Sequence, residues 1–283
     1  MLKYRSGSTG EEIELSSGNI RAHIKTAGLY DYEWEVNATT KLLGSKIKNF
    51  GKKAKKYEIT LDFRGNQEER ANAAEKLYEM SERDVVKMMP GRLIFKDHYL
   101  MCYIIGGEIG TSKLKRAVEK TVYAYAPYPF WIREESRSFP PISPNEQQDD
   151  ACLDYEHDYP YDYTMPYGGD VIWKVGHFAP CEFLMTMFGP AVDPRVVING
   201  HLYQIYTTLD TNEYLQIDSR NNRVIKYLAN GIQQDIYDLR AKQESVFDPI
   251  TPGNISVVWP GDFGFDLTLF CERSEPRWKT RSS

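Results

Sequence analysis

The stretch Asp193–Tyr227, DPRVVINGHLYQIYTTLDTNEYLQIDSRNNRVIKY, indicates the fold class of this 283-residue chain. Asn199-Gly200 is typical of a tight hairpin, because a primed turn needs positive φ at both central residues. Asp210–Asn212 and Asn221-Asn222 supply further turn chemistry. The runs between these turns are rich in Val, Ile, Leu and Tyr, which suit a pleated, half-buried surface. We predict a meander of short strands here, and the stretch contains no catalytic signature.

The rest of the C-terminal half continues this pattern. Residues 171–175 and 255–259 are short apolar runs, and two further segments alternate apolar with polar residues. The alternating positions are Cys181, Phe183, Met185 and Met187 in the first segment and Phe265, Leu267, Leu269 and Cys271 in the second. Many short strands with regularly spaced turns are typical of a β-sandwich.

The N-terminal half mixes strands with one helix. Residues 57–63 alternate, and Asn66 followed by Glu69 predicts a capping box at the start of a helix over 67–83. A hairpin over 92–105 and a strand over 114–126 follow. Earlier in the chain, Tyr32, Trp34 and Val36 share one parity and predict a half-buried strand.

The order of these elements predicts a mainly β chain with two domains. Pro127–Trp131 closes a first domain over 1–131, residues 132–170 are polar and irregular enough for a linker or extended loop, and 171–283 form the second domain. Residues 1–130 carry 22 Lys and Arg against 17 Asp and Glu, whereas residues 131–283 carry 13 against 23. This asymmetry favours two domains of different character. It fits either a basic half that contacts the acidic half of a neighbouring subunit, or unrelated solvated surfaces.

The bulk composition is that of an ordinary water-soluble protein. We expect no membrane insertion, because no run of about 18 apolar residues occurs, and no secretory signal, because the N-terminus has no apolar core. Cys102, Cys152, Cys181 and Cys271 lie far apart and are expected to be reduced thiols, mostly buried, which fits synthesis in a reducing cytoplasm.

A search for chemistry predicts no catalytic residue, no cofactor-binding residue and no metal ligand. The GxSxG, HExxH, GxxxxGK[ST], GxGxxG and paired CxxC motifs are absent. The five histidines are scattered, which disfavours a zinc site. The acidic run 149–162 has oxygen ligands suited to calcium, but a solvated linker explains it better. A pair of carboxylates for glycoside hydrolysis cannot be singled out among 40 acidic residues.

Two surface features leave alternatives open. The basic run 46–56, with six lysines, fits an exposed β-hairpin tip or loop, a nucleic-acid contact or a contact with an acidic surface of an adjacent subunit. Aromatic residues of the second domain fit core packing or a face that stacks on sugar rings. These aromatic residues are Trp173, Tyr203, Tyr206, Tyr214 and Trp259.

The order of motifs resembles the distal tail proteins of long-tailed bacteriophages over approximately residues 55–130 and 171–273. The first domain shows a strand with Leu61-Asp-Phe63, the helix 67–83, a hairpin and the closing Pro129-Phe-Trp131. The second shows FGPAVDPRVVING at 188–200, EYLQID at 213–218, Asn230-Gly231 and FDPITPGN at 247–254. The basic run 46–56 and the acidic run 149–162 match no motif of that family.

The resemblance implies a fold and a function. The first domain is expected to be a β-sandwich or split barrel with one helix, related to tail-tube subunits, and the second a galectin-like β-sandwich. Six copies are expected to form a ring at the virion tail tip, around a channel through which DNA passes, and to connect the tail tube to the adhesion device. The implied partners are the major tail tube protein, the tape-measure protein, tail-associated lysin or fibre proteins, and receptor-binding proteins. The alternative function is a carbohydrate-binding module for recognition of the host cell wall.

Overall fold

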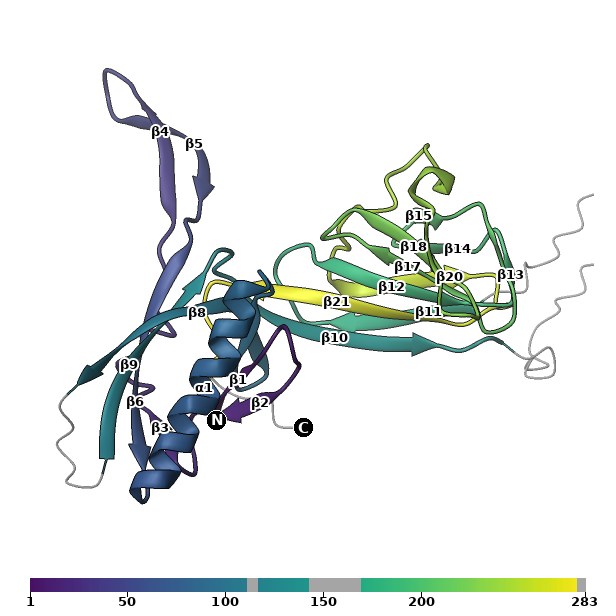
Figure 1. Cartoon of the computed structure of the whole chain (residues 1–283). Helices are drawn as coiled ribbons and strands as arrows, with labels where there is room; N and C mark the ends of the chain where they lie inside the picture. Colours follow the sequence, from purple (N-terminus) through teal and green to yellow (C-terminus); the bar gives the residue numbers. More distant parts are fainter. Residues whose placement is uncertain (111–116, 143–168, 279–283) are drawn as a thin grey trace, which may run out of the picture. The chain divides into compact units, whose positions relative to one another are not determined.

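The structure is a computed structural model that describes residues 1–110, 117–142 and 169–278. The chain forms two compact units: unit 1 comprises Met1–Arg133 and Glu272–Ser283, and unit 2 comprises Glu134–Cys271. It leaves unit 1 within β10 (Trp131–Phe139) and returns to it within β21 (Phe265–Arg273) (Figure 1). Antiparallel strands dominate both units, which confirms the prediction of a mainly β fold.

Unit 1 is built around one long strand, β8 (His98–Gly110). The first part of β8 pairs with β7 (Gly91–Phe95), and its second part pairs with β9 (Ala117–Ala126), so β8 belongs to two runs of strands. One run continues from β7 to the first two strands, and the other continues from β9 to β6 and β3. The remaining strands that take part are β1 (Leu2–Arg5), β2 (Glu12–Glu14), β3 (Ile20–Ala22) and β6 (Lys55–Arg64).

Alternation along β6 builds the core of unit 1. Tyr57, Ile59, Leu61 and Phe63 are all buried, as the sequence predicts. Trp131 at the start of β10 is fully buried in the same cluster and packs edge-on against Tyr57. The helix α1 (Gln67–Val86) lies beside these strands and contributes Leu77 and Met80 to the core. Its apolar side chains recur at helical spacing, which explains why one face of α1 is buried.

Both ends of α1 are fixed by side chains. Asn66 accepts a hydrogen bond from the Glu69 backbone N–H, and the Glu69 carboxylate accepts one from the Asn66 backbone N–H, which confirms the predicted capping box. Near the other end, Asp84 is fully buried and accepts hydrogen bonds from the hydroxyls of Tyr4 (2.6 Å) and Ser6 (2.7 Å). Burial acts to raise the pKa of Asp84, but these hydrogen bonds outweigh it and hold the pKa below its ordinary value.

The described part of unit 2 consists of two facing sheets and one small ribbon, β13-β16. One sheet has the order β11-β20-β14-β15, and the other has the order β19-β18-β17-β12-β21-β10. Leu215, Ile217, Phe183 and Met185 from the second sheet share one buried cluster with Val196 and Val257 from the first, as expected for a sandwich. The strand bounds are β11 (Gly169–Val175), β12 (Glu182–Phe188), β13 (Ala191–Val192), β14 (Arg195–Ile198), β15 (His201–Gln204), β16 (Thr208–Leu209), β17 (Tyr214–Asp218), β18 (Arg223–Tyr227), β19 (Gln233–Asp235) and β20 (Gly253–Trp259).

The turns predicted within 193–227 are present. Asn199 and Gly200 join β14 to β15 with φ of 50° and 84°, the positive values that a primed turn requires. Asn222, with φ of 51°, belongs to the turn between β17 and β18. These three positive angles are accessible because Gly lacks a Cβ and Asn tolerates the left-handed region.

Two sequence predictions are wrong. Residues 131–139 form strand β10, although the polar stretch from 132 was expected to be irregular. The reason is its pairing: Ile132 is opposite Tyr99 of β8, and Ser136 hydrogen-bonds Thr268 of β21, so neighbouring strands support a polar sequence. The half-buried strand predicted from Tyr32, Trp34 and Val36 is also wrong. The strand in this region begins only at Glu35, after Tyr32 and Trp34, and Val36 on that strand is exposed. Residues 143–168, which include the acidic run 149–162, lie outside the described residues.

Candidate assembly interface

A hairpin in unit 1, formed by β4 (Glu35–Thr40) and β5 (Ser45–Gly51), stands away from the rest of that unit (Figure 1). Every side chain from Asp31 to Phe50 is exposed, so neither face of the hairpin lies on a core. Isolated two-stranded hairpins are only marginally stable in water. Of the basic run 46–56, Lys46 and Lys48 lie on β5 of this exposed hairpin, whereas Lys52 and Lys53 follow the hairpin and Lys55 and Lys56 belong to β6.

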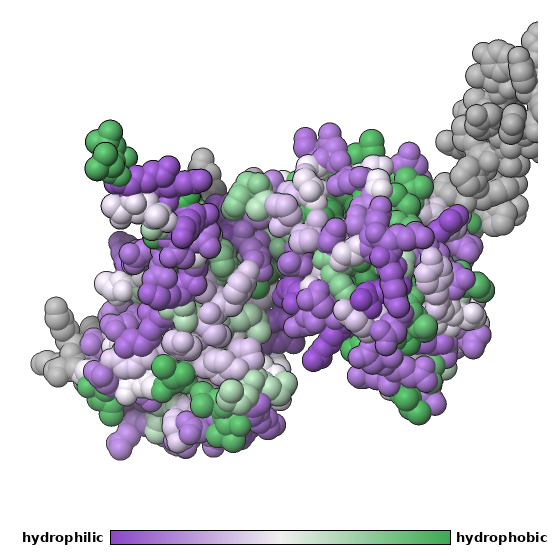
Figure 2. All heavy atoms as spheres, turned by 90° about the horizontal axis from the view of Figure 1, so that it is seen from above, coloured by the Kyte–Doolittle hydropathy of each residue, from purple (hydrophilic) through white to green (hydrophobic). Residues whose placement is uncertain are grey.

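The tip of this hairpin is apolar. Leu42 is 100% exposed and Leu43 is 91% exposed. The turn between the strands is closed by a hydrogen bond from the Lys41 backbone N–H to the Gly44 carbonyl (2.9 Å), and Gly44 has φ of 81°. At the upper left of Figure 2, a hydrophobic group of atoms stands above hydrophilic residues. Large apolar side chains gathered at a projecting tip indicate a contact surface.

The base of the hairpin is held by a lysine among aromatic rings. The Lys52 ammonium nitrogen lies 4.5 Å from the centroid of Phe130, 5.0 Å from that of Trp34 and 5.5 Å from that of Tyr32. Partial burial and the neighbouring charge of Lys55 lower the pKa of Lys52 to about 8. We call these four residues the Lys52 cage. Cation–π attraction at such distances fixes the hairpin base to Phe130 in the segment before β10.

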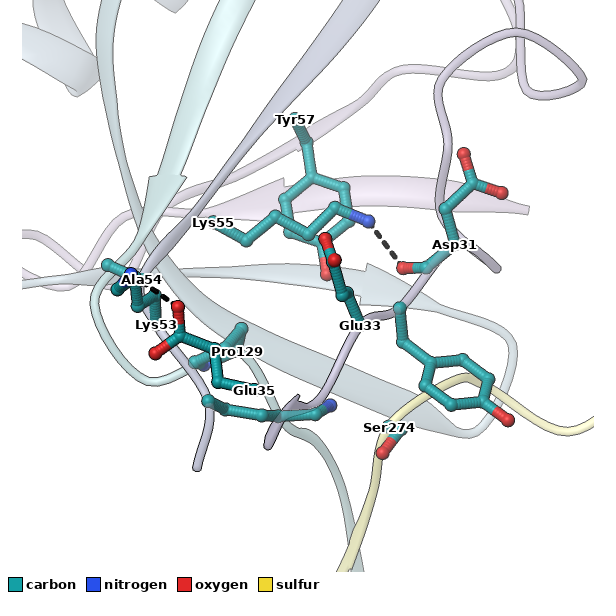
Figure 3. A pocket seen from close by; sticks show the side chains of 11 residues that line it. Asp31, Glu33, Glu35, Lys53, Ala54, Lys55, Tyr57, Pro129 and Ser274 are labelled. Atoms are coloured by element: carbon teal, nitrogen blue, oxygen red, sulfur yellow. Dashed lines mark hydrogen bonds and ion pairs between the residues drawn. The ribbon is translucent and has the colours of Figure 1, made fainter. Parts of the chain in front are cut away.

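A pocket of about 440 Å³ opens beside the Lys52 cage. Figure 3 shows Lys55 pointing to the backbone of Asp31, and its ammonium group donates to the carbonyls of Asp31 and Gly28. Lys53 forms an ion pair with Glu35 across the same pocket. Lys56 lies 3.7 Å from Glu58. Four of the six lysines of the run 46–56 therefore have partners inside unit 1.

A second hollow in unit 1 lies between α1 and the strands β8 and β9. It has a volume of about 340 Å³. Leu77, Ile104 and Val122 are buried at its floor, and Tyr78 and Ile105 stand at its rim with 52% and 53% exposure. We call it the α1 groove. An apolar floor with exposed apolar rims is suited to an apolar side chain from another molecule.

Three of the five aromatic residues considered for a sugar-stacking face of unit 2 belong to its core. Trp173, Tyr203 and Trp259 are buried in the sandwich core, where Phe139 packs edge-on against both tryptophans. Tyr214 stacks on Tyr227 at 4.5 Å between ring centroids. Tyr206 remains exposed. The alternating positions of Trp173, Tyr203 and Trp259 point into the sandwich, so core packing is the correct interpretation of these residues.

The turns of unit 2 are well anchored. The Asn199 side chain donates to the Thr251 carbonyl (3.1 Å) and accepts from the Ser256 backbone N–H (3.0 Å). Glu213 forms an ion pair with Lys226 (2.7 Å), and this contact lowers the pKa of Glu213. Exposed turns on a rigid sandwich are suitable docking points for other proteins.

The described residues contain no group of three or more His, Cys, Asp or Glu side chains with a metal-binding arrangement. His23 contacts Asp62 (3.1 Å), and His98 is buried beside Asp97 (2.7 Å). Cys102, Cys181 and Cys271 are buried, which confirms the expectation for these three thiols, and burial raises the pKa of Cys102 to about 12. His157, Cys152 and the calcium candidate 149–162 lie outside the described residues. No helix of the described part meets the length and hydropathy needed to cross a membrane.

Two structurally important groups escaped the sequence analysis. Asp84 lies in the last turn of α1, where the helix dipole disfavours a carboxylate, and this conflict is a signal that it has specific partners. The Lys52 cage joins residues from three segments. In the sequence, only the i, i+2 spacing of Tyr32 and Trp34 hints at it. That spacing is typical of one face of a strand, so it does not predict that both rings contact Lys52.

Comparisons with known proteins agree with the fold expected from the motifs. No protein-family model and no curated protein matches the sequence. Among solved structures, the chain is similar to the Dit protein of phage SPP1, described as a paradigm of the hub adsorption apparatus in phages that infect Gram-positive bacteria. The TM-score is 0.59 at 11% identity, over 96% of this chain and 99% of that one.

The same fold occurs in the phage P2 baseplate. A chain of that baseplate in its activated conformation with Ca has a TM-score of 0.58 at 8% identity, over 98% of this chain and all of that one. The corresponding structure with Sr gives 0.57 at 9% identity and the same coverage. The chain therefore has the fold of phage hub proteins, across both units.

Proposed function

We propose that this chain is a distal tail protein of a bacteriophage, a structural virion component that forms a ring at the tail tip and connects the tail tube to the adhesion device. The observation that carries the proposal is the extent of the fold similarity: the SPP1 Dit protein aligns over 99% of its own length with 96% of this chain. A shared single domain would leave many functions open, because one fold hosts many of them. A similarity that extends over both units, in the same order along the chain, is compatible with fewer functions.

The surfaces of unit 1 support self-assembly. Two different surfaces project or open on the same unit, the hairpin with Leu42 and Leu43 at its tip and the α1 groove. A head-to-tail contact between different surfaces produces a closed ring when its rotation closes. A hexamer, as in the resemblance to distal tail proteins, is the ring size that we propose.

The role of unit 2 in this proposal is docking. Its anchored turns at 199–200, 210–212 and 221–222 would contact receptor-binding or fibre proteins, and the ring would contact the tail tube and tape-measure proteins. DNA would cross the ring only in transit. The proposed role requires no catalysis and no cofactor, since a hub acts by holding other proteins in place.

Sedimentation velocity of the purified chain tests the ring. We expect a species of six copies of the 32.7 kDa chain, with intermediates that disappear as concentration rises. Antibody labelling of tail tips on negatively stained particles of the phage that encodes the chain tests the location. A strict monomer at tens of micromolar, together with unlabelled tail tips, would refute the proposal.

A further inference from the structure

The hairpin tip and the α1 groove of unit 1 have complementary apolar surfaces. Leu42 and Leu43 present almost their whole side chains to water. The groove has a buried floor that includes Leu77 and Ile104 and a half-exposed rim, within about 340 Å³. Covering the tip with the groove removes apolar surface of both from water, which is favourable and roughly proportional to the area removed.

Two glycines of β8 belong to the lining of the groove. Gly106 and Gly107 line it, and the pairing of β8 with β9 shifts register between Ile104 and Gly106. A Cβ on Gly107 would lie 2.9 Å from the Thr121 carbonyl oxygen, too close for any other residue without movement of β9. Glycine within a strand often marks a site where another chain segment approaches closely.

Charge also favours this pairing. From Val36 to Phe50 the hairpin has no acidic residue, and Lys41, Lys46 and Lys48 flank its tip. The helix α1 carries six acidic and three basic residues. All of the acidic residues of α1 except Asp84 are exposed, and Glu82 lines the groove together with Lys120. Opposite charges around an apolar contact orient the two partners and exclude others.

We propose that the Leu42–Leu43 tip of one copy inserts into the α1 groove of a second copy of this chain. The tip is exposed in its own chain and so does not occupy its own groove. A second copy is the occupant because each chain carries both halves of the complementary pair, so one contact repeats from chain to chain. This inference rests on the proposed ring and names the surfaces that close it.

Disulfide cross-linking tests the contact directly. In a Cys152→Ser background the remaining cysteines are buried, so Leu43→Cys with Ile105→Cys introduces the only exposed pair among the described residues. We expect oxidation to give covalent ladders up to the full ring. The matched control combines Leu43→Cys with Ile172→Cys, an exposed isoleucine of unit 2, and should remain mostly monomeric on denaturing gels.

Association measurements test the same contact without cysteines. Replacing Leu42 and Leu43 by serine should raise the dissociation constant between subunits about tenfold or more for each leucine, whereas Ile172→Ser should not change it. Glu75→Lys with Glu82→Lys should weaken association, and Lys46→Glu with Lys48→Glu in the same chain should restore it. Sedimentation velocity measures all of these variants in full-length protein.

The outcomes separate this inference from the ring itself. If wild-type rings form but the double serine variant forms them equally well, or the control pair cross-links as strongly as the test pair, the tip does not occupy the groove and the inference is overturned. The ring proposal then stands. If the wild-type chain is a strict monomer at tens of micromolar, both fail.

Discussion

The chain contains two hairpins with similar local chemistry and opposite environments. The β4–β5 hairpin turns at Gly44, and the β14–β15 hairpin turns at Asn199-Gly200; both use a glycine with φ above 80°. Along β14 every second side chain is buried in the sandwich, whereas along β4 every side chain is exposed. The comparison shows that turn residues and strand pairing are enough to form a hairpin. Whether the hairpin stabilises a core or offers a contact surface depends on whether another element covers its faces.

The largest expected difference is between two isoleucines, one in each hairpin. Ile198 is 1% exposed and Ile47 is 51% exposed. Ile198→Ala should lower the free energy of unfolding of unit 2 by about 2–5 kcal/mol, because it removes buried methyl groups and leaves a cavity. Ile47→Ala should change stability by less than about 0.5 kcal/mol. Urea unfolding followed by tryptophan fluorescence measures both, and equal effects would contradict the contrast drawn here.

Asp84 stabilises unit 1, from which the exposed β4–β5 hairpin projects. Asp84→Ala leaves the hydroxyls of Tyr4 and Ser6 and the Ser8 backbone N–H (2.9 Å) without their acceptor, so we expect unit 1 to lose about 2–4 kcal/mol. Glu82→Ala, at an exposed position of the same helix, is the control. Differential scanning calorimetry should show a lower transition for unit 1 alone.

The same group predicts a pH dependence. Because the folded-state pKa of Asp84 is below its unfolded value of 3.8, its stabilising contribution is fully present above that value and is lost as the pH falls through the folded pKa. The wild-type chain should therefore lose stability more steeply below about pH 4 than Asp84→Asn does. Parallel curves for the two proteins between pH 2 and 5 would contradict this assignment.

The two turn glycines form a matched pair with a smaller expected effect. Gly200→Ala forces a side chain into the left-handed region and should cost unit 2 about 1–2 kcal/mol, since β14 and β15 are part of its core sheet. Gly44→Ala has the same backbone strain, but the β4–β5 hairpin contributes little to the global free energy of unfolding. We expect no change in the midpoint of denaturation for Gly44→Ala. A common shift for both variants would show that the exposed hairpin is coupled to folding.

The smallest expected effect concerns the Lys52 cage. Lys52→Met removes the cation from Tyr32, Trp34 and Phe130 but also removes the cost of burying a charge, so we expect the stability of the hairpin base to change by less than about 1 kcal/mol. Because burial lowers the folded-state pKa of Lys52 to about 8, below its value of 10.5 in the unfolded chain, the stability of the wild-type hairpin base should rise as the pH rises from about 8 to 10.5. We expect a fluorescence change with a midpoint near the folded-state pKa in the wild-type chain, absent in Lys52→Met. Identical titrations of the two proteins would show that the cage does not depend on the charge.

Where local signals and burial coincide, sequence analysis located elements closely. The capping box at Asn66 and Glu69 marks the start of α1, and alternation at Tyr57–Phe63 marks the buried face of β6. Both signals act within a few residues. The same reasoning failed at Tyr32–Val36, because alternation predicts a buried face only if another element covers it. It also failed at 132–139, where pairing with β8 and β21 supports a strand with mostly polar side chains.

The sequence by itself determined most of the strands, the turns at Asn199-Gly200 and Asn221-Asn222, the single helix and the absence of recognisable catalytic motifs, because these depend on residue type and short-range spacing. Only the tertiary structure decided that Trp173, Tyr203 and Trp259 belong to a core, that Lys52 sits among three rings, and that Leu42 and Leu43 remain uncovered. Burial is a property of what lies opposite a side chain, and contacts between distant segments form only in the folded chain.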